Sequence, residues 1–193
     1  MKANLESVET RFGQSRVIMH CDAGVVPEAK TFMATLVERM RHGLALRDGM
    51  VWPLGWSHFI LRKNGDDYIA NEPNYATNPV FALRQDCTTT LAVHREMVAF
   101  AALNGASPMF AKFPDRIVVR QGWAHQTALT AERTDNSVES GWRIDFPNAT
   151  SETGVIKVYD LLGVRPSLLR VLALPRGSTV TVNHDDAVAT LPS

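Results

Sequence analysis

The last third of the chain carries the pattern that most constrains its fold, because strand and helix periods alternate there over a short distance. Residues 141–146 alternate apolar and polar side chains, which predicts a strand with Trp142 on its buried face. Pro166 suits the first turn of a following helix, since its fixed φ is already helical. The buried side of that helix is expected to hold Leu168, Leu169, Leu172 and Leu174. The β-branched run of residues 178–182 predicts a further strand.

The first half of the chain has a different order of elements. Apolar spacing and turn residues predict a strand at Arg11–Met19, a helix from Pro27 to Gly43, a hairpin of residues 56–62 and 68–70 joined at Asn64-Gly65, and a helix at 89–103. Segment 155–162 is dense enough in apolar residues for a strand end or a short helix. Helix and hairpin followed by a separate strand-rich part favour an α+β fold, with mixed or antiparallel sheets, over a doubly wound α/β fold.

Length and composition permit two small subdomains. The chain has 193 residues, of which 45% are hydrophobic and 21% charged, which is typical of a globular protein. Two prolines between residues 106 and 114 mark the predicted boundary. We therefore expect an N-terminal α+β subdomain at residues 1–110 and a C-terminal α+β subdomain at residues 111–193.

Charge and apolar runs restrict the partners that the sequence predicts. Residues 1–110 hold 11 basic and 11 acidic residues, and residues 111–193 hold 9 of each. Nucleic-acid binding is not expected, because phosphate neutralisation needs clustered Lys and Arg. The first residues lack the apolar core of a secretory signal, and the longest apolar run, 97–103, is too short to span a bilayer. The sequence predicts a cytoplasmic protein without a membrane partner.

Few residues have a spacing suited to catalysis. The chain lacks the glycine-rich and histidine motifs of hydrolases, nucleotide-binding proteins and metalloproteases. His20-Cys21-Asp22 resembles a nucleophile and its base, but neighbours on a strand point to opposite faces. His94 and Glu96 lie two apart on a helix and cannot share a ligand. We therefore expect no enzymatic activity and no cofactor.

The remaining polar clusters and the cysteines have ordinary structural interpretations. His184-Asp185-Asp186 has metal-binding residue types, but it lies near the end of the chain, where such residues are usually solvated, and no metal is expected. Cys21 and Cys87 are the only cysteines and form no C-x-x-C pair. They are expected to be buried thiols.

The C-terminal part resembles a known family. The motifs are Ser140-Gly141-Trp142, Arg165-Pro166-Ser167-Leu168, and Pro175 with Gly177-Ser178, within residues 117–186. They are similar to those of a bacterial immunity-protein family, whose members are cytosolic antidotes to polymorphic or secretion-system toxins, including type VI toxins. The resemblance implies that the C-terminal part is an immunity-type subdomain and that the partner is a cognate toxin effector. The motif residues are interpreted as determinants of the fold rather than as the toxin-binding surface.

The toxin-binding candidates come from residue type and position. Tyr and Trp dominate interface hot spots, and an acidic hairpin could compete with phosphate in a basic nuclease site. The loop aromatics that could be anchors are Trp52, Trp56, Tyr68, Tyr75 and Trp123. The residues that we select as toxin-binding candidates are Asp66, Asp67, Tyr68, Glu72 and Trp123.

Two other classes of function remain open from the sequence. The chain could be a small-ligand-binding or regulatory domain, or an enzyme whose active residues are scattered along the sequence. A basic toxin gene immediately upstream would favour the immunity protein over both alternatives. The oligomeric state and the identity of the toxin do not follow from the sequence.

Overall fold

The computed structural model describes residues 5–134, 140–150 and 152–192. These form two compact units, Met1–Arg95 and Glu96–Ser193, and the division falls inside α2 (Thr88–Leu103). The structure is 29% helical and 38% strand with two mixed sheets, which confirms the α+β prediction. The predicted boundary at residue 110 lies beyond this division. The second half of α2 buries Met97, Phe100 and Ala101 and belongs to unit 2.

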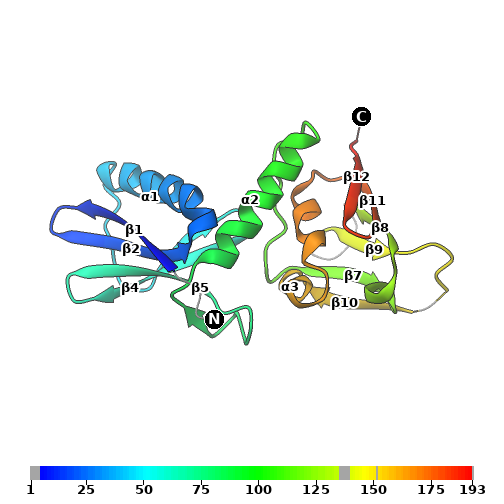
Figure 1. Ribbon diagram of the computed structural model, residues 1–193, viewed down its shortest axis with the longest axis horizontal. Helices are drawn as coiled ribbons and strands as arrows, with labels where there is room; N and C mark the ends of the chain where they lie inside the picture. Colours follow the sequence, from blue (N-terminus) through cyan, green and yellow to red (C-terminus); the bar gives the residue numbers. More distant parts are fainter. Residues whose placement is uncertain (1–4, 135–139, 151, 193) are drawn as a thin grey trace. The chain divides into compact units, whose positions relative to one another are not determined.

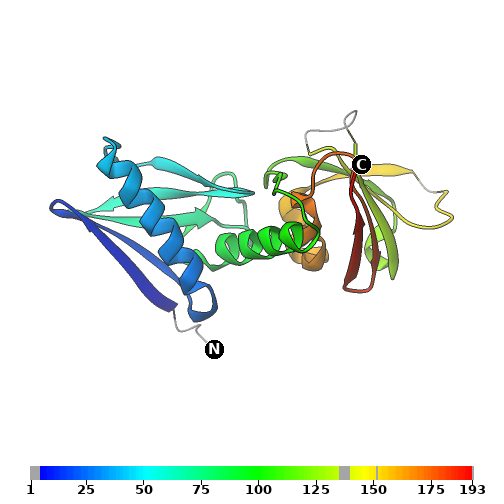
Figure 2. The same cartoon turned by 90° about the horizontal axis from the view of Figure 1, so that it is seen from above.

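Unit 1 consists of a sheet with α1 (Val26–Arg41) packed on one face (Figures 1 and 2). The strand order is β1-β2-β5-β4-β3, with the short β6 beside β5. β2 and β5 are parallel, and the other neighbours are antiparallel. The strands are β1 (Leu5–Phe12), β2 (Ser15–Asp22), β3 (Met50–Leu54), β4 (Ser57–Asn64), β5 (Asp67–Pro73) and β6 (Leu83–Arg84).

The predicted hairpin is confirmed, and one predicted strand is wrong. Asn64 pairs with Asp67, so β4 and β5 are joined by a two-residue loop. The strand expected at Arg11–Met19 is instead two strands with a turn between Phe12 and Ser15. Gly13 has φ +62°, a left-handed conformation that glycine adopts without strain and that reverses the chain there.

Helix α1 begins and ends as its sequence predicts. Pro27 lies in its first turn, and Glu28 places a negative charge near the positive end of the helix dipole. At the other end, Gly43 has φ +95°, its N–H bonds Met40 O at 3.0 Å, and Leu44 N–H bonds Arg39 O at 3.0 Å. This Schellman motif satisfies the last carbonyls and turns Leu44 back onto the core. The buried face consists of Ala29, Phe32, Met33, Leu36 and Met40.

Unit 2 contains a second mixed sheet, in the order β10-β7-β9-β8-β11-β12 (Figure 1). β7 and β9 are parallel, and the other neighbours are antiparallel. Trp142 on β9 is fully buried, which confirms the predicted face of this strand. The strands are β7 (Arg116–Arg120), β8 (Ala128–Arg133), β9 (Trp142–Asp145), β10 (Thr153–Lys157), β11 (Thr179–Asn183) and β12 (Asp186–Thr190).

The helical segments of unit 2 are short. The apolar segment predicted at residues 155–162 contains the end of β10, the 3₁₀ turn η3 (Val158–Asp160) and the start of α3 (Leu161–Val164). The helix predicted at Pro166 is the 3₁₀ helix η4 (Pro166–Ala173). The four leucines expected to be buried are buried: Leu168, Leu169, Leu172 and Leu174. A second 3₁₀ turn, η2 (Trp123–His125), follows β7.

Candidate functional site

The acidic hairpin is less exposed than its sequence predicts. Asp66 is exposed at the tip of the β4–β5 turn. Asp67 accepts two hydrogen bonds from Arg16, from Nε at 3.0 Å and from Nη2 at 2.6 Å. These hydrogen bonds lower the pKa of Asp67, so its charge is held by Arg16. Of the hairpin carboxylates, Asp66 presents the most accessible charge to a partner.

The expectation that Glu72 belongs to an exposed cluster is wrong. Its side chain is fully buried at the end of β5, under the first turn of α2. One carboxylate oxygen accepts from Arg84 Nε at 2.7 Å, and the other accepts from the backbone N–H of Thr90 at 2.6 Å. Burial raises the pKa of Glu72 despite these partners. Glu72 therefore fixes the start of α2 to the sheet, because it satisfies a helix N–H that has no partner within the helix.

Tyr68 and Trp123 are also buried, contrary to the prediction that they are surface anchors. Tyr68 is 8% exposed and donates to Leu46 O at 3.3 Å. Trp123 in η2 is 6% exposed. Large aromatic side chains bury more apolar area than most residues, so both of them pack in the interior of their units.

Two further aromatic candidates form a buried network in unit 1 that the sequence analysis missed. The rings of Trp56 and Tyr75 stack with centroids 5.1 Å apart. Trp56 Nε1 donates to Thr90 O at 3.1 Å, and the Tyr75 hydroxyl lies 2.9 Å from Thr90 Oγ1 and also bonds Ser57 Oγ. Residues from β4, from the segment after β5 and from α2 thus share one polar cluster. No sequence spacing reports this arrangement, because the partners are 15 to 34 positions apart.

The sequence His20-Cys21-Asp22 does not bring a base to a thiol. The His20 ring lies 2.9 Å from the Ser7 hydroxyl, while Cys21 is buried on the opposite face of β2. Burial raises the pKa of the Cys21 thiol, which favours its unreactive protonated form. Asp22 accepts from Gly24 N–H at 2.8 Å and caps the turn before α1. Cys87 is buried as well, so the prediction of two buried thiols is confirmed.

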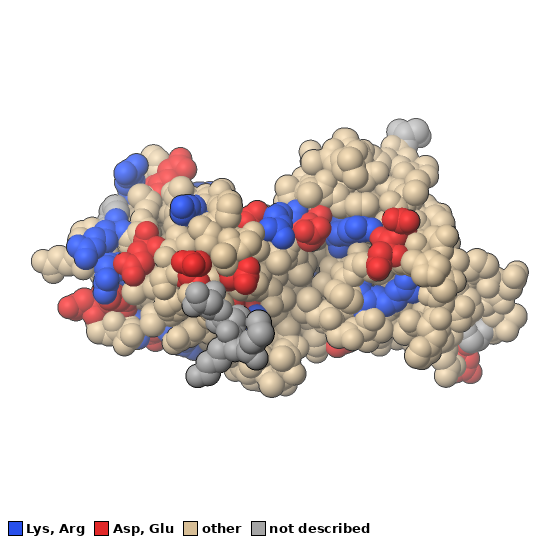
Figure 3. Space-filling model, in the orientation of Figure 1, with Lys and Arg blue, Asp and Glu red and all other residues tan. Residues whose placement is uncertain are grey.

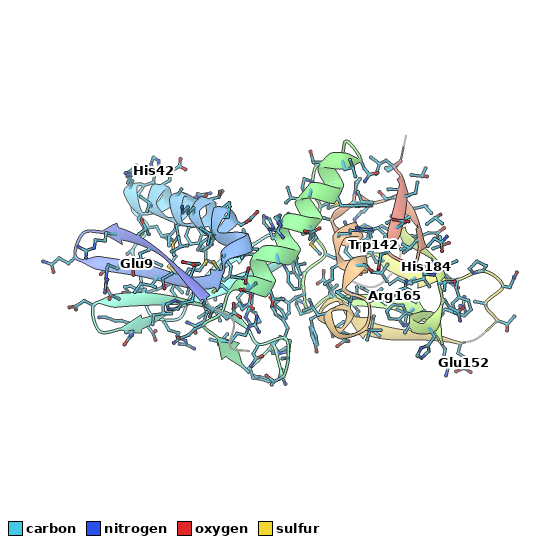
Figure 4. All side chains as sticks on the ribbon, viewed as in Figure 1. Glu9, His42, Trp142, Glu152, Arg165 and His184 are labelled. Atoms are coloured by element: carbon cyan, nitrogen blue, oxygen red, sulfur yellow. The ribbon has the colours of Figure 1, made fainter. Side chains whose placement is uncertain are left out.

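The other polar candidates also have local roles. His184 lies at the β11–β12 turn with φ +55°, exposed, and its ring contacts the Asn183 side chain at 3.0 Å (Figure 4). The two aspartates that follow it are exposed. His94 is half-buried and Glu96 is exposed. Within the described residues, no three His, Cys, Asp or Glu side chains gather as a metal ion would require.

Two of the three sequence motifs noted in the C-terminal part, Ser140-Gly141-Trp142 and the segment from Pro175 to Ser178, lie beside one buried cation. Arg133 is 5% exposed, and its guanidinium donates to three backbone carbonyls, those of Ser140, Met109 and Leu174. It also lies over the Trp142 ring, 5.8 Å from the centroid. Burial lowers the pKa of Arg133 to about 10. The guanidinium thus joins three segments that are distant in the sequence.

Two glycines of the same motifs have backbone roles around Arg133. Gly141 has φ +76°, and a Cβ at this position would lie 2.6 Å from the backbone oxygen of Thr134. Gly177 N–H bonds Arg133 O at 2.7 Å, and Arg133 N–H bonds Ser178 O at 2.9 Å. These residues therefore have a structural role in unit 2.

A loop connects β5 to β6 (Figure 1). It carries the most exposed large apolar side chain in the described structure. Phe81 is 86% exposed, and Val80 beside it is 60% exposed. We call residues 74–82 the apolar loop. Its ends are joined by a hydrogen bond from Asn74 N–H to Ala82 O at 2.8 Å. No sequence pattern distinguishes this loop, because Phe81 is a single aromatic residue that follows Pro79-Val80.

Asparagines hold the apolar loop in shape. The Asn78 carbonyl accepts from Ala82 N–H at 2.8 Å and from Phe81 N–H at 3.2 Å. Its side chain accepts from Val80 N–H at 3.1 Å, which is an Asx turn. Pro79 is buried beneath the turn. The two exposed side chains therefore project from a fixed backbone.

No family model, no curated protein and no solved structure matches this chain. Among the described helices, none is long and apolar enough to cross a membrane.

Proposed function

We propose that the chain is an immunity-type protein that binds a toxin acting in the cytosol and neutralises it by forming a one-to-one complex. The apolar loop is the observation that carries this proposal. The resemblance of the C-terminal motifs supplies the class of partner, and the loop supplies a means of recognition.

The apolar loop has the properties of an interface anchor. An aromatic side chain that enters a partner's pocket removes a large apolar area from water. Phe81 presents that area before binding, because it is 86% exposed. The hydrogen bonds of Asn74 and Asn78 already fix the backbone, so binding orders fewer degrees of freedom. The loop carries no charged residue, which suits an apolar pocket on the partner.

Charge has a smaller role in this proposal than in the sequence analysis. Asp67 is paired with Arg16 and Glu72 is buried, so Asp66 is the exposed carboxylate of the hairpin. Figure 3 shows basic and acidic side chains interspersed on the visible face of each unit. Mixed surface charge of this kind steers association less strongly than a field of one sign.

Co-expression with the product of the neighbouring gene, which the proposal requires to be the toxin, tests the proposal. The wild-type chain should restore growth and co-purify with the toxin at a ratio of one to one. Phe81→Ala should weaken the complex by roughly 30-fold or more, as truncation of an aromatic hot spot does. Its fold should be unchanged, because surface substitutions alter the free energy of unfolding by about 0.5 kcal/mol or less.

Leu103→Ala is the matched control, since Leu103 is 83% exposed and belongs to the other unit. It should leave the affinity within about twofold. Asp66→Asn should slow association at low salt only slightly. If the neighbouring toxin does not bind, the immunity function fails. If it binds and Phe81→Ala has no effect, the apolar loop is not the recognition element.

A further inference from the structure

Unit 1 also contains an open groove between the C-terminal half of α1 and the edge strand β3. Its volume is about 670 Å³, within the range of roughly 300–1,000 Å³ that is usual for small-molecule sites. The groove is remote in the sequence from the apolar loop and uses none of its residues. It is lined by Thr35, Arg39, His42, Gly43, Leu44, Met50, Val51, Trp52 and Pro53.

The floor of the groove is apolar and rigid. Trp52 is half-buried, and its ring meets the Phe32 ring edge to face, with centroids 6.0 Å apart. Met50 is buried in the same core. Leu44 is held against that core by the Schellman motif at the end of α1. A flat apolar body could therefore lie on the indole without disturbing the fold.

One wall of the groove presents two unpaired polar side chains. Thr35 and Arg39 lie four positions apart on one face of α1, and His42 is the residue that caps the end of this helix. Arg39 and His42 are exposed, and neither side chain forms a hydrogen bond or an ion pair with a described residue. His42 points outward from the end of α1 (Figure 4). None of the residues that line the groove is acidic.

The C-terminal end of α1 should repel a bound anion only weakly. The negative end of a helix dipole arises from carbonyls without partners. Here the carbonyls of Arg39 and Met40 accept the N–H groups of Leu44 and Gly43. The guanidinium of Arg39 is then the dominant local charge on the groove wall.

The edge strand argues against an extended peptide as the occupant. β3 is the last strand of its sheet, and such an edge can accept another strand. Pro53 on β3 has no N–H, so a ladder of main-chain hydrogen bonds cannot continue along it. Recognition in the groove must rest on side chains, which suits a small molecule.

We infer that this groove binds a small organic anion, whose apolar body lies on Trp52 and Leu44 and whose anionic group lies between Arg39 and His42. The guanidinium supplies charge-assisted hydrogen bonds to a carboxylate or a sulfonate. This site is independent of the toxin partner, and it gives the chain a second class of ligand.

Two related fluorescent probes test the inference. 8-Anilinonaphthalene-1-sulfonate has an aromatic body and an anionic group, and N-phenyl-1-naphthylamine has nearly the same body without charge. The wild-type protein should bind the sulfonate more tightly than the neutral probe. The double variant Arg39→Gln/His42→Gln should weaken binding of the sulfonate by about tenfold and leave the neutral probe unchanged.

Arg41→Gln is the matched control, because Arg41 is exposed in the same helical turn but does not line the groove. It should leave both affinities unchanged. Thr35→Trp should block the groove and abolish binding of both probes. The inference is overturned if Arg41→Gln weakens the sulfonate as much as the double variant does, if the two probes bind the wild type equally, or if Thr35→Trp leaves binding intact.

Discussion

Each unit buries a side chain that carries a full charge when ionised in water, Glu72 in unit 1 and Arg133 in unit 2, and the two are stabilised in different ways. In unit 1, Glu72 is paired with the cation of Arg84 and with a helix N–H. In unit 2, Arg133 has carbonyl acceptors in place of a carboxylate. Burial shifts both pKa values toward the neutral form, upward for Glu72 and downward to about 10 for Arg133. In both sites hydrogen bonds replace part of the water that the charged form loses on burial.

The two charges differ in how much of the chain they organise. The partners of Glu72 are 12 and 18 positions away, on the short strand β6 and in the first turn of α2. The acceptors of Arg133 are 7, 24 and 41 positions away, on three segments that the guanidinium holds together. Loss of Arg133 should therefore affect all of unit 2, whereas loss of Glu72 should affect mainly the attachment of α2.

The largest expected effect is that of Arg133→Met. Three carbonyls would lose their donor in a buried site, so the free energy of unfolding should fall by about 3–5 kcal/mol. Urea denaturation followed by tryptophan fluorescence measures this change. Arg143→Met is the control, because Arg143 is exposed and pairs with Asp145 on the same strand, β9, so its loss should cost less than about 1 kcal/mol. Equal losses in the two variants would show that Arg133 does not organise unit 2.

A smaller loss is expected from Gly141→Ala. The added Cβ would lie 2.6 Å from Thr134 O at a φ of +76°, so clash and backbone strain add to about 2–3 kcal/mol. The turn at Gly141 also places Ser140 O against Arg133. Gly122→Ala separates the two causes, because Gly122 has φ +87° but nothing within 4 Å of its Cβ position. If the unfolding temperature falls by the same amount in both variants, the Cβ of Gly141→Ala does not clash with Thr134 O.

The smallest effect concerns Glu72 and depends on pH. Burial raises the pKa of Glu72 above its usual 4.5, so the folded state binds this proton more tightly than the unfolded chain. Its contribution to stability is fully present below pH 4.5 and is lost as the pH rises through the raised value. Over this rise in pH, the free energy of unfolding of the wild type should fall relative to that of Glu72→Gln. The expected fall is about 1.4 kcal/mol for each pH unit that separates the folded and unfolded pKa values of Glu72.

Urea unfolding of the wild type and Glu72→Gln between about pH 4 and pH 8 measures this difference. Carboxylates such as Asp67 titrate in both proteins and cancel. The opposite trend, with the wild type gaining stability over the variant as the pH rises, would mean that Arg84 and the Thr90 N–H outweigh burial. The ion pair of Glu72 with Arg84 would then stabilise unit 1. This would increase the difference from unit 2, where Arg133 is bound by carbonyls without a paired carboxylate.

The elements that the sequence predicted well are those set by local chemistry. Pro27 and Gly43 delimit α1, and Asn64-Gly65 begins the turn of the β4–β5 hairpin. The alternation around Trp142 gave the correct buried face. The sequence pattern was too weak to predict two features. A turn at Gly13 divides the single strand predicted there into β1 and β2, and the edge strand β12 follows the polar residues after Asn183.

The candidate site could not be read from the sequence, because exposure is decided by packing among distant residues. Asp66, Asp67 and Glu72 are close in sequence, but one is exposed, one is paired with Arg16 from β2, and one is buried under α2. Tyr68 and Trp123 were predicted to be surface anchors because they are aromatic, but both side chains are buried.

The amino-acid sequence by itself determined the α+β class, the limits of α1, the β4–β5 hairpin and the face of Trp142, because each depends on residues within a few positions of one another. The tertiary structure alone decided which charges are buried, which aromatic side chain is exposed on the apolar loop, and where α1 and β3 leave a groove. These features arise where segments far apart in the chain meet and their side chains lose water and gain contacts with protein. A local sequence pattern cannot predict them, because the partners are distant in the sequence.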